Sequence, residues 1–551
     1  MFNEFEALLD RLLIKMCKAI KKNKDPAFTE DERRFLDDSQ KTSLLLIKKL
    51  AQGSKEPNYQ MACSALFAHA LTSLRYNYER HEVWAKRLYG KIGEALSQYA
   101  PHCSTDCVIN IIQAFYEARL DVPEHFKEWS MEALAPDDAS MPSPEALHAY
   151  GQNMVESLFE EQPDMTAFEL SDLLFQSLHA MPPETLGVIV NCLLESPRTA
   201  AQDAAVLFLL HPNSKNRAQA INILSEISEH QSLTPESLRR LVIIRQWSPD
   251  GERQPIDTLI ARQRKRGALF AETPKPPAIV RYEASMFDGS GVQLIFFETQ
   301  QGKQHQLGGL LVKREVGIRD AWITPTHLPS KELRAVKKEM QQERPLVMLQ
   351  VDGDYVARIV SHYIALNTNN DETPEPHLLE IHEHLGAPGW RAEPTSIETL
   401  LTALIAEVNP DGISAAWIEQ SLERSGNWMG YEEFTESWFE VSPNIDALIN
   451  RHTLRINGTH QINRNAALQE LSSKGFEALR YKWVELFSWM ALMAKSQLIA
   501  DNCMLWKDFA TLAYVLHQGQ AMHDIPLMQS MVHDSLSISI DSMKERGGYL
   551  Q

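Results

Sequence analysis

Residues 279–351 form the one long stretch of this chain whose pattern is typical of β-strands, and patterns typical of helices surround it on both sides. Residues 279–287 alternate apolar and polar side chains with a period of two, as a strand with one buried face does. The following Asp288-Gly289-Ser290-Gly291 favours a tight hairpin turn. Residues 292–297 are β-branched and aromatic, which predicts a second, better buried strand.

The same stretch continues as a small mixed module. Residues 300–303 predict a second turn and residues 307–312 a third strand, so the three strands favour an antiparallel meander. Residues 346–351 predict a fourth strand and residues 355–366 a helix. The fold class expected is therefore mainly α, with a small α+β module in the middle and helical regions before and after it.

Helical patterns between residues 147 and 247 are short and closely spaced. Residues 205–224 combine an apolar helix, the turn His211-Pro212-Asn213-Ser214 and a second amphipathic helix. This unit resembles one pair of a HEAT-like α-helical repeat, whose pairs stack because one pair cannot bury its apolar face alone. The resemblance implies a protein-interaction surface in this region, and an irregular helical bundle is the alternative.

At 551 residues the chain exceeds the size of one hydrophobic core. Prolines at 136–144 and 273–277 favour linkers. We expect a helical N-terminal domain at 1–140, HEAT-like repeats at 141–274, the α+β module at 275–372 and a helical C-terminal domain at 373–551. The apolar segment 487–493 predicts a buried helix in that last domain.

The formal net charge of −19 makes this an acidic protein and opposes general binding of nucleic acids or anionic membranes. No apolar run approaches the roughly 20 residues that span a bilayer, and six scattered cysteines do not form a disulfide framework. We therefore expect a soluble, cytoplasmic protein. The basic run at 262–266 is either a phosphate contact or a set of cations at a helix C-terminus, and the second interpretation is favoured.

Two groups of residues are candidates for chemistry. Acidic side chains in or beside the α+β module could bind a metal or transfer protons if they converge: Asp288, Asp320, Asp352 and Asp354. His377, Glu380 and His384 fall on one face of a helix and offer metal ligands. Prolines before this helix and Gly386 after it predict a short, exposed element, and no fourth ligand is identified, so a solvated polar face is favoured.

The sequence has no phosphate-binding loop, no nucleophile elbow and no paired CxxC motif. We therefore predict an interaction protein of scaffold or adaptor type, with another protein as its partner and with no cofactor or metal. The alternative is an enzyme whose acidic or metal-assisted site lies in the α+β module or at His377, Glu380 and His384.

Overall fold

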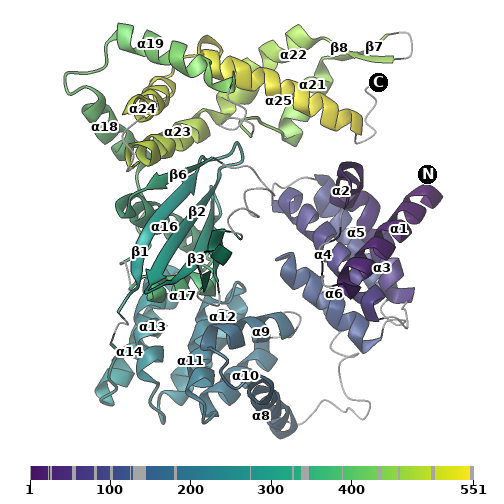
Figure 1. Ribbon diagram of the computed structural model, residues 1–551, viewed down its shortest axis with the longest axis vertical. Helices are drawn as coiled ribbons and strands as arrows, with labels where there is room; N and C mark the ends of the chain where they lie inside the picture. Colours follow the sequence, from purple (N-terminus) through teal and green to yellow (C-terminus); the bar gives the residue numbers. More distant parts are fainter. Residues whose placement is uncertain are drawn as a thin grey trace. The chain divides into compact units, whose positions relative to one another are not determined.

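The computed structural model describes residues 2–545, apart from gaps at 23, 25, 27, 53–56, 80–82, 100–103, 124–125, 128–143, 179–180, 182, 273–274, 325–327, 330, 335, 337–346, 387–388, 431–436, 457–458 and 498–502. Helices make up most of this part, an antiparallel sheet lies in the middle of the chain and helices follow it, so the predicted fold class is confirmed (Figure 1). The chain divides into two compact units, Met1–Phe208 with Asn222–Ile227 and Leu209–Ile221 with Ser228–Gln551. Of the predicted linker at 136–144, residues 136–143 lie outside the described residues, and Pro144 is the first residue of a helix.

The first unit begins with helices around one apolar core: α1 (Phe2–Lys21), α2 (Glu30–Asp37), α3 (Ser39–Gln52), α4 (Pro57–Glu79), α5 (Val83–Tyr99) and α6 (Thr105–Glu117). Their apolar stripes meet in a cluster of buried side chains that includes Leu46, Phe67 and Phe115. Phe67 and Phe115 pack edge to face with ring centroids 5.9 Å apart. Burying each such side chain contributes about 1.5–3 kcal/mol, which makes this core the main stabilising element here.

The short helices predicted from residue 147 onward are present: α8 (Pro144–Glu161), α9 (Ala167–Ser177), α10 (Pro183–Glu195), α11 (Thr199–Leu207), α12 (Ser214–Ile227) and α13 (Pro235–Trp247). Within the first unit, α8 packs on α10 and α9 packs on α11. Leu207, Leu210 and Leu224 are buried as the apolar pattern predicts. At the turn, His211 is buried and its Nδ1 accepts a hydrogen bond from the Asn213 N–H at 3.0 Å.

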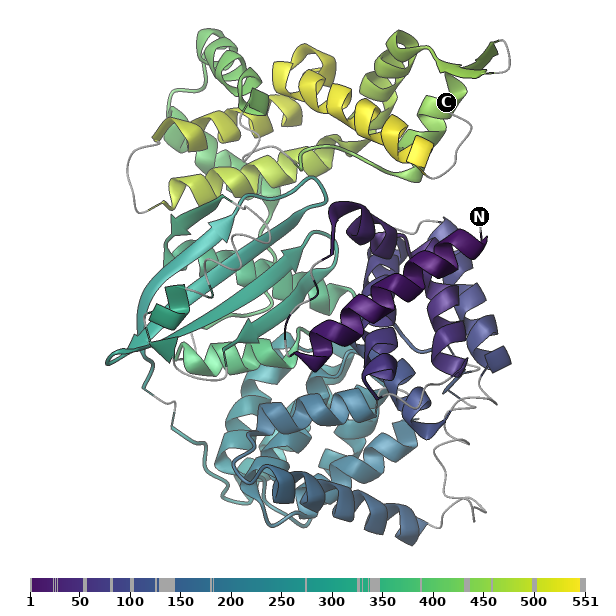
Figure 2. The same cartoon turned by 45° about the vertical axis from the view of Figure 1, so that its right-hand side comes forward.

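The sheet in the second unit contains β1 (Ala278–Ser285), β2 (Val292–Gln301), β3 (Gln304–Lys313), β4 (Gly317–Ile323) and β6 (Met348–Val351), in the order β4-β3-β2-β1-β6 (Figure 2). All neighbouring pairs are antiparallel, so the predicted meander is confirmed. A short strand, β5 (Leu328–Pro329), also pairs with β3. Opposed residues on one face form a buried row across four strands: Ala284, Ile295, Leu310 and Ala321.

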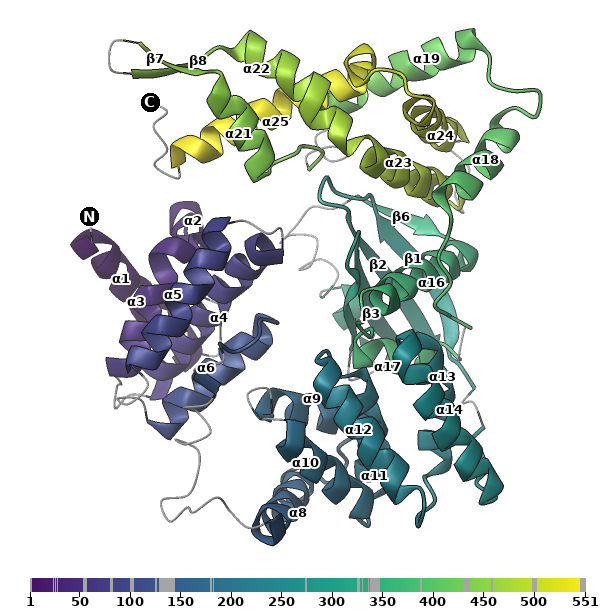
Figure 3. The ribbon, with the colours of Figure 1, turned by 180° about the vertical axis from the view of Figure 1, so that it is seen from behind.

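Two helices pack against this sheet, namely α16 (Gly353–Asn369) and α17 (Pro376–His384), and both contact β4 (Figure 3). The expectation that α17 is exposed is wrong. Its Leu378, Leu379 and Ile381 are fully buried, because the helix lies between the sheet and α13 rather than on the surface. Proline and glycine at its ends limit its length but do not set its exposure.

The C-terminal region of the second unit is helical apart from a two-stranded hairpin of β7 (Thr453–Ile456) and β8 (Thr459–Ile462). Its helices include α18 (Ile397–Val408), α19 (Ala415–Gly426), α21 (Pro443–Arg451), α22 (Arg464–Glu470), α23 (Arg480–Lys495), α24 (Cys503–His517) and α25 (Pro526–Glu545). The predicted buried helix at 487–493 is confirmed as part of α23, where Phe487 and Trp489 are fully buried. No helix in the described part of the chain combines the length and apolar content needed to cross a membrane.

Candidate functional site

The four aspartates proposed from the sequence do not share one site. Asp288 belongs to the β1–β2 turn, where its Oδ1 accepts hydrogen bonds from the N–H groups of Ser290 (2.9 Å) and Val292 (2.8 Å). Its carboxylate therefore closes the hairpin, as Asx residues do in tight turns.

The other three aspartates lie at opposite edges of the sheet. Asp320 is on β4, whereas Asp352 and Asp354 follow β6, at the far end of the strand order. Four strand spacings of about 4.8 Å place these edges about 19 Å apart. Asp352 caps α16, since its Oδ1 accepts the Tyr355 N–H at 2.8 Å, and Asp354 is exposed in the first turn.

The histidine-rich helix α17 is also engaged in packing. Nε2 of His384 lies 2.8 Å from Oγ1 of Thr299 on β2, and the buried ring of His382 packs edge to face on Trp247 with centroids 5.4 Å apart. Among the described residues, no three His, Cys, Asp or Glu side chains gather as a metal site would require. The contact of His384 with Thr299 ties α17 to the sheet.

The carboxylate of Glu383 binds two arginines of α13. Its Oε1 accepts hydrogen bonds from Arg239 (3.0 Å) and Arg240 (2.9 Å), and its Oε2 accepts a second one from Arg240 (3.0 Å). Burial raises the pKa of this carboxyl, but the two guanidinium groups outweigh burial and hold the pKa below its usual value. The cluster joins α17 to α13 by charge-assisted hydrogen bonds.

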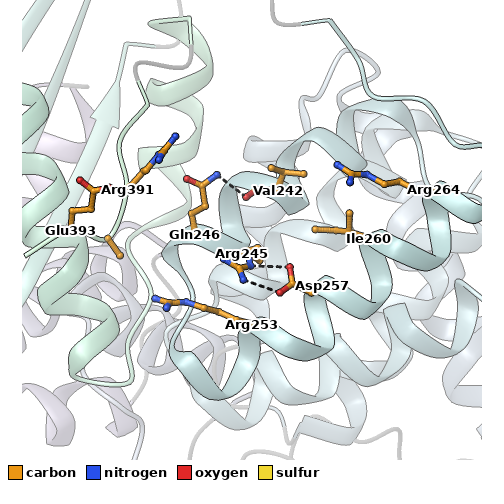
Figure 4. Close-up of a pocket in the computed structure, with 10 residues that line it drawn as sticks. Val242, Arg245, Gln246, Arg253, Asp257, Ile260, Arg264, Arg391 and Glu393 are labelled. Carbon is orange, nitrogen blue, oxygen red and sulfur yellow. Dashed lines mark hydrogen bonds and ion pairs between the residues drawn. The ribbon is translucent and has the colours of Figure 1, made fainter.

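An open pocket with four arginines lies close to these contacts, between α13, α14 (Asp250–Lys265) and the segment 391–393 (Figure 4). We call it the arginine pocket. It has a volume of about 530 Å³ and is lined by Val242, Arg245, Gln246, Arg253, Asp257, Ile260, Arg264, Arg391, Ala392 and Glu393. Its lining carries two more positive than negative charges, in a protein whose formal net charge is −19.

Helix geometry explains how the pocket forms. The α14 residues that line it are spaced by four, three and four positions, so they share one face: Arg253, Asp257, Ile260 and Arg264. Thr234 fixes the start of the facing helix, α13, because its hydroxyl accepts the Ser237 N–H at 3.0 Å. Nothing in the sequence links Arg391, more than a hundred residues farther on, to these two helices.

One ion pair neutralises part of the pocket. Arg245 binds Asp257 through two parallel hydrogen bonds of 2.9 and 2.8 Å. The hydrogen bond from Arg245 lowers the pKa of the Asp257 carboxyl, and the same bond raises the pKa of the Arg245 guanidinium. Both side chains remain partly exposed, so water and salt screen the pair.

The other arginines are less fully neutralised. Arg253 donates to the Ser248 carbonyl at 2.9 Å and pairs with the exposed Asp250 at 2.6 Å. Arg264 lies over the ring of Phe270, 4.9 Å from its centroid. The exposed Arg391 extends from the other wall of the pocket (Figure 4), and within the described residues neither its guanidinium nor that of Arg264 donates a hydrogen bond.

The basic run at 262–266 lies at the C-terminal end of α14, as the favoured interpretation predicts. Arg262 donates to the Ser228 hydroxyl at 3.1 Å, and Arg266 donates to the carbonyls of Glu229 and His230 at 2.8 and 2.9 Å. These two arginines hold the loop that follows α12. Arg264, between them, faces the pocket. The sequence thus drew attention to the run that contains Arg264 without assigning it to a site, and it missed Arg245, Arg253 and Arg391.

Apolar side chains border the pocket. Leu269 and Phe270 follow α14 and are 77% and 38% exposed. Two hydrogen bonds hold this segment on α13, from the Ala271 N–H to the Pro235 carbonyl (3.1 Å) and from Arg239 to the Glu272 carbonyl (2.9 Å). An exposed apolar edge therefore sits at a fixed place beside the arginines.

A second cavity, of about 430 Å³, lies where the β3–β4 turn approaches α16, α18 and α23. Its Arg314 pairs with Glu485 at 2.7 Å and with Glu315. Burial raises the pKa of Glu485 even though Arg314 lowers it. The cation in this cavity is matched by acids, so the arginine pocket is the stronger candidate for a binding site.

Two family models match parts of this chain. Residues 182–267 match the Y4lR second domain, which covers α10 to α14 and three of the four pocket arginines. Residues 398–540 match the Y4lR C-terminal helical domain. Together the two matches cover less than half of the sequence. Neither the curated proteins nor the solved structures gave a match.

Proposed function

We propose that this protein is an interaction protein of scaffold or adaptor type, located in the cytoplasm, which binds another protein rather than converting a small molecule. The observation that carries the proposal is the arginine pocket with the exposed Leu269 and Phe270 beside it. Arginine and aromatic residues are enriched at the centres of protein interfaces. A pocket this open suits a side chain or loop of a partner better than an enclosed substrate.

The proposal includes HEAT-like stacking of the short helices. In a stacked array each helix packs on its counterpart in the next pair, and the contacts of α8 with α10 and of α9 with α11 follow that pattern. Such arrays offer elongated faces whose polar residues are free to vary without loss of the core. This stacking supports an interaction role but names no partner.

The test is capture of a partner by the full-length protein and by two matched variants. The pocket variant combines Arg253→Gln, Arg264→Gln and Arg391→Gln. The charge control combines Arg11→Gln, Arg33→Gln and Arg87→Gln, three exposed arginines of the first unit, and changes the net charge equally. Circular dichroism and thermal melting establish that both variants fold.

We expect the unmodified protein and the charge control to retain the same partner, which then binds as a purified protein in a defined ratio, and the pocket variant to lose it. Turnover of a small molecule by the purified protein, abolished by Asp320→Asn or Asp352→Asn, would replace this proposal with the enzyme alternative.

A further inference from the structure

We propose that the arginine pocket receives an acidic segment of the partner protein, with at least two carboxylates next to an apolar side chain. This inference rests on the proposed function and specifies the chemistry that the site recognises. The carboxylates would pair with Arg264 and Arg391, and the apolar side chain would cover Leu269 and Phe270.

The first argument is the hydrogen-bonding capacity of the pocket. A guanidinium has five N–H donors in a planar fork that matches the two oxygens of a carboxylate. Within the described residues, the forks of Arg264 and Arg391 donate to no other group, and they come from different walls of the pocket (Figure 4). Two separate carboxylates therefore satisfy the pocket better than a single one.

The second argument distinguishes a protein segment from a nucleic acid. The pocket lining contains two carboxylates, Asp257 and Glu393, among its arginines. These carboxylates repel a polyphosphate, because its negative charges are densely spaced along the whole backbone. The net charge of −19 opposes every acidic ligand, and it opposes a polyphosphate more strongly than a peptide with two carboxylates because the polyphosphate carries more negative charge. Two carboxylates spaced along a peptide avoid these acids more easily than a continuous phosphate backbone does.

The third argument is the apolar border. The guanidinium of Arg264 lies over the ring of Phe270, and Leu269 is the more exposed of the two apolar side chains. A cation held on an aromatic ring is positioned before the partner arrives, so less side-chain entropy is lost on binding. An apolar side chain on the partner would remove Leu269 from water and anchor the segment beside its carboxylates.

The test is selection from a displayed library of random peptides on the immobilised full-length protein, with the pocket variant as the counter-selection. We expect the selected peptides to be enriched in Asp and Glu next to Leu, Ile or Phe. Fluorescence anisotropy of one selected peptide should show binding that weakens with added salt and falls about tenfold when either Arg264 or Arg391 is replaced. The charge control should bind like the unmodified protein.

One variant should strengthen binding. Asp257→Asn removes the carboxylate that neutralises Arg245, so the guanidinium of Arg245 becomes available to the peptide. The affinity for the acidic peptide should therefore rise several-fold. A loss of pocket structure would not produce tighter binding.

The inference is overturned if the selected peptides lack acidic residues, if Asp257→Asn does not tighten binding, or if inorganic phosphate or a single-stranded oligonucleotide displaces the peptide at concentrations below those of a Glu-rich peptide. The proposed function survives that result if partner capture still depends on the pocket arginines. If capture does not depend on them, the proposed function fails whatever peptides are selected.

Discussion

Arginine illustrates how one residue type takes unrelated roles that its sequence neighbours do not reveal. Arg217 is fully buried and binds the Glu252 carboxylate at 2.9 Å and the Asp371 carbonyl at 2.7 Å. Arg391, in contrast, is exposed and lines a pocket. A run of cations predicts a charged helix end, but the position of partners far away in the sequence decides which cations face solvent. The candidate site was therefore only partly predictable.

Leu224 offers the simplest test of the apolar pattern in the helical repeats. Leu224 on α12 is fully buried, whereas its neighbour Asn222 is exposed. Leu224→Asp should reduce the free energy of unfolding by more than about 3 kcal/mol, because it removes a buried side chain and adds an unpaired charge. Asn222→Asp adds the same charge at the surface and should cost less than about 0.5 kcal/mol. Denaturant unfolding followed by circular dichroism measures both, and equal losses would contradict the buried position of Leu224.

Two buried histidines predict how stability changes with pH. Burial lowers the pKa of His362 and of His382 from 6.5 to about 4. Between these values the unfolded chain binds more protons than the folded protein, so stability is complete above about pH 6.5 and is lost as the pH falls toward 4. Each histidine contributes on the order of 3 kcal/mol to this loss.

The check is thermal melting at neutral pH and near pH 5, comparing the unmodified protein with a double variant. His362→Asn keeps an acceptor for the Thr395 N–H, and His382→Phe keeps a ring against Trp247. The double variant should lose less stability on acidification than the unmodified protein. His523→Asn removes an exposed histidine and should leave the pH dependence unchanged. Identical profiles for all three proteins would show that neither buried histidine controls acid stability.

At the scale of elements, the sequence pattern predicted the turns and strands whose conformation depends on their own residues. The hairpin at 288–291 followed from its turn residues, and Gly291 does adopt a positive φ of 79°. Strand β4 was not predicted, because its sequence carries Gly317 and Asp320 and lacks a clear alternation. It forms because β3 supplies a partner strand, and because Oδ1 of Asn367 on α16 accepts the Ile318 N–H at 2.8 Å. A pattern within a few consecutive residues does not reveal such a partner.

Gly289 in the same hairpin has a different role, which tests how the hairpin docks on the segment 437–439. Its N–H donates to the Ser437 carbonyl at 2.9 Å, and a Cβ at this position would come within 2.7 Å of the Phe439 carbonyl oxygen. Gly289→Ala should therefore destabilise the protein by about 1–3 kcal/mol. Gly251→Ala has open space around it on α14 and should be neutral or stabilising by up to about 1 kcal/mol. A stable Gly289→Ala protein would mean that the hairpin does not approach this segment so closely.

For the second unit as a whole, contacts distant in the sequence join the helices α13 and α14 to the sheet module. Trp247 donates its Nε1–H to the Trp390 carbonyl at 2.9 Å, and Arg217 reaches the Asp371 carbonyl. The match to the Y4lR second domain ends at residue 267, before the sheet begins. These buried contacts cross that boundary, so α13, α14 and the sheet should unfold together rather than as separate modules.

Glu383 provides the sharpest test of this cooperativity. Glu383→Gln leaves Arg239 and Arg240 facing each other without a carboxylate in a largely buried site, which should cost about 3–5 kcal/mol. Asp257→Asn breaks a partly exposed ion pair between α14 and α13 and should cost less than about 1 kcal/mol. If the helices and the sheet are one cooperative unit, limited proteolysis of the Glu383→Gln protein should open α13 and the sheet strands at the same temperature. If α13 becomes cleavable while the sheet remains protected, the two parts unfold independently. The contacts of Glu383, Trp247 and Arg217 would then hold the helices in place without coupling their stability to that of the sheet.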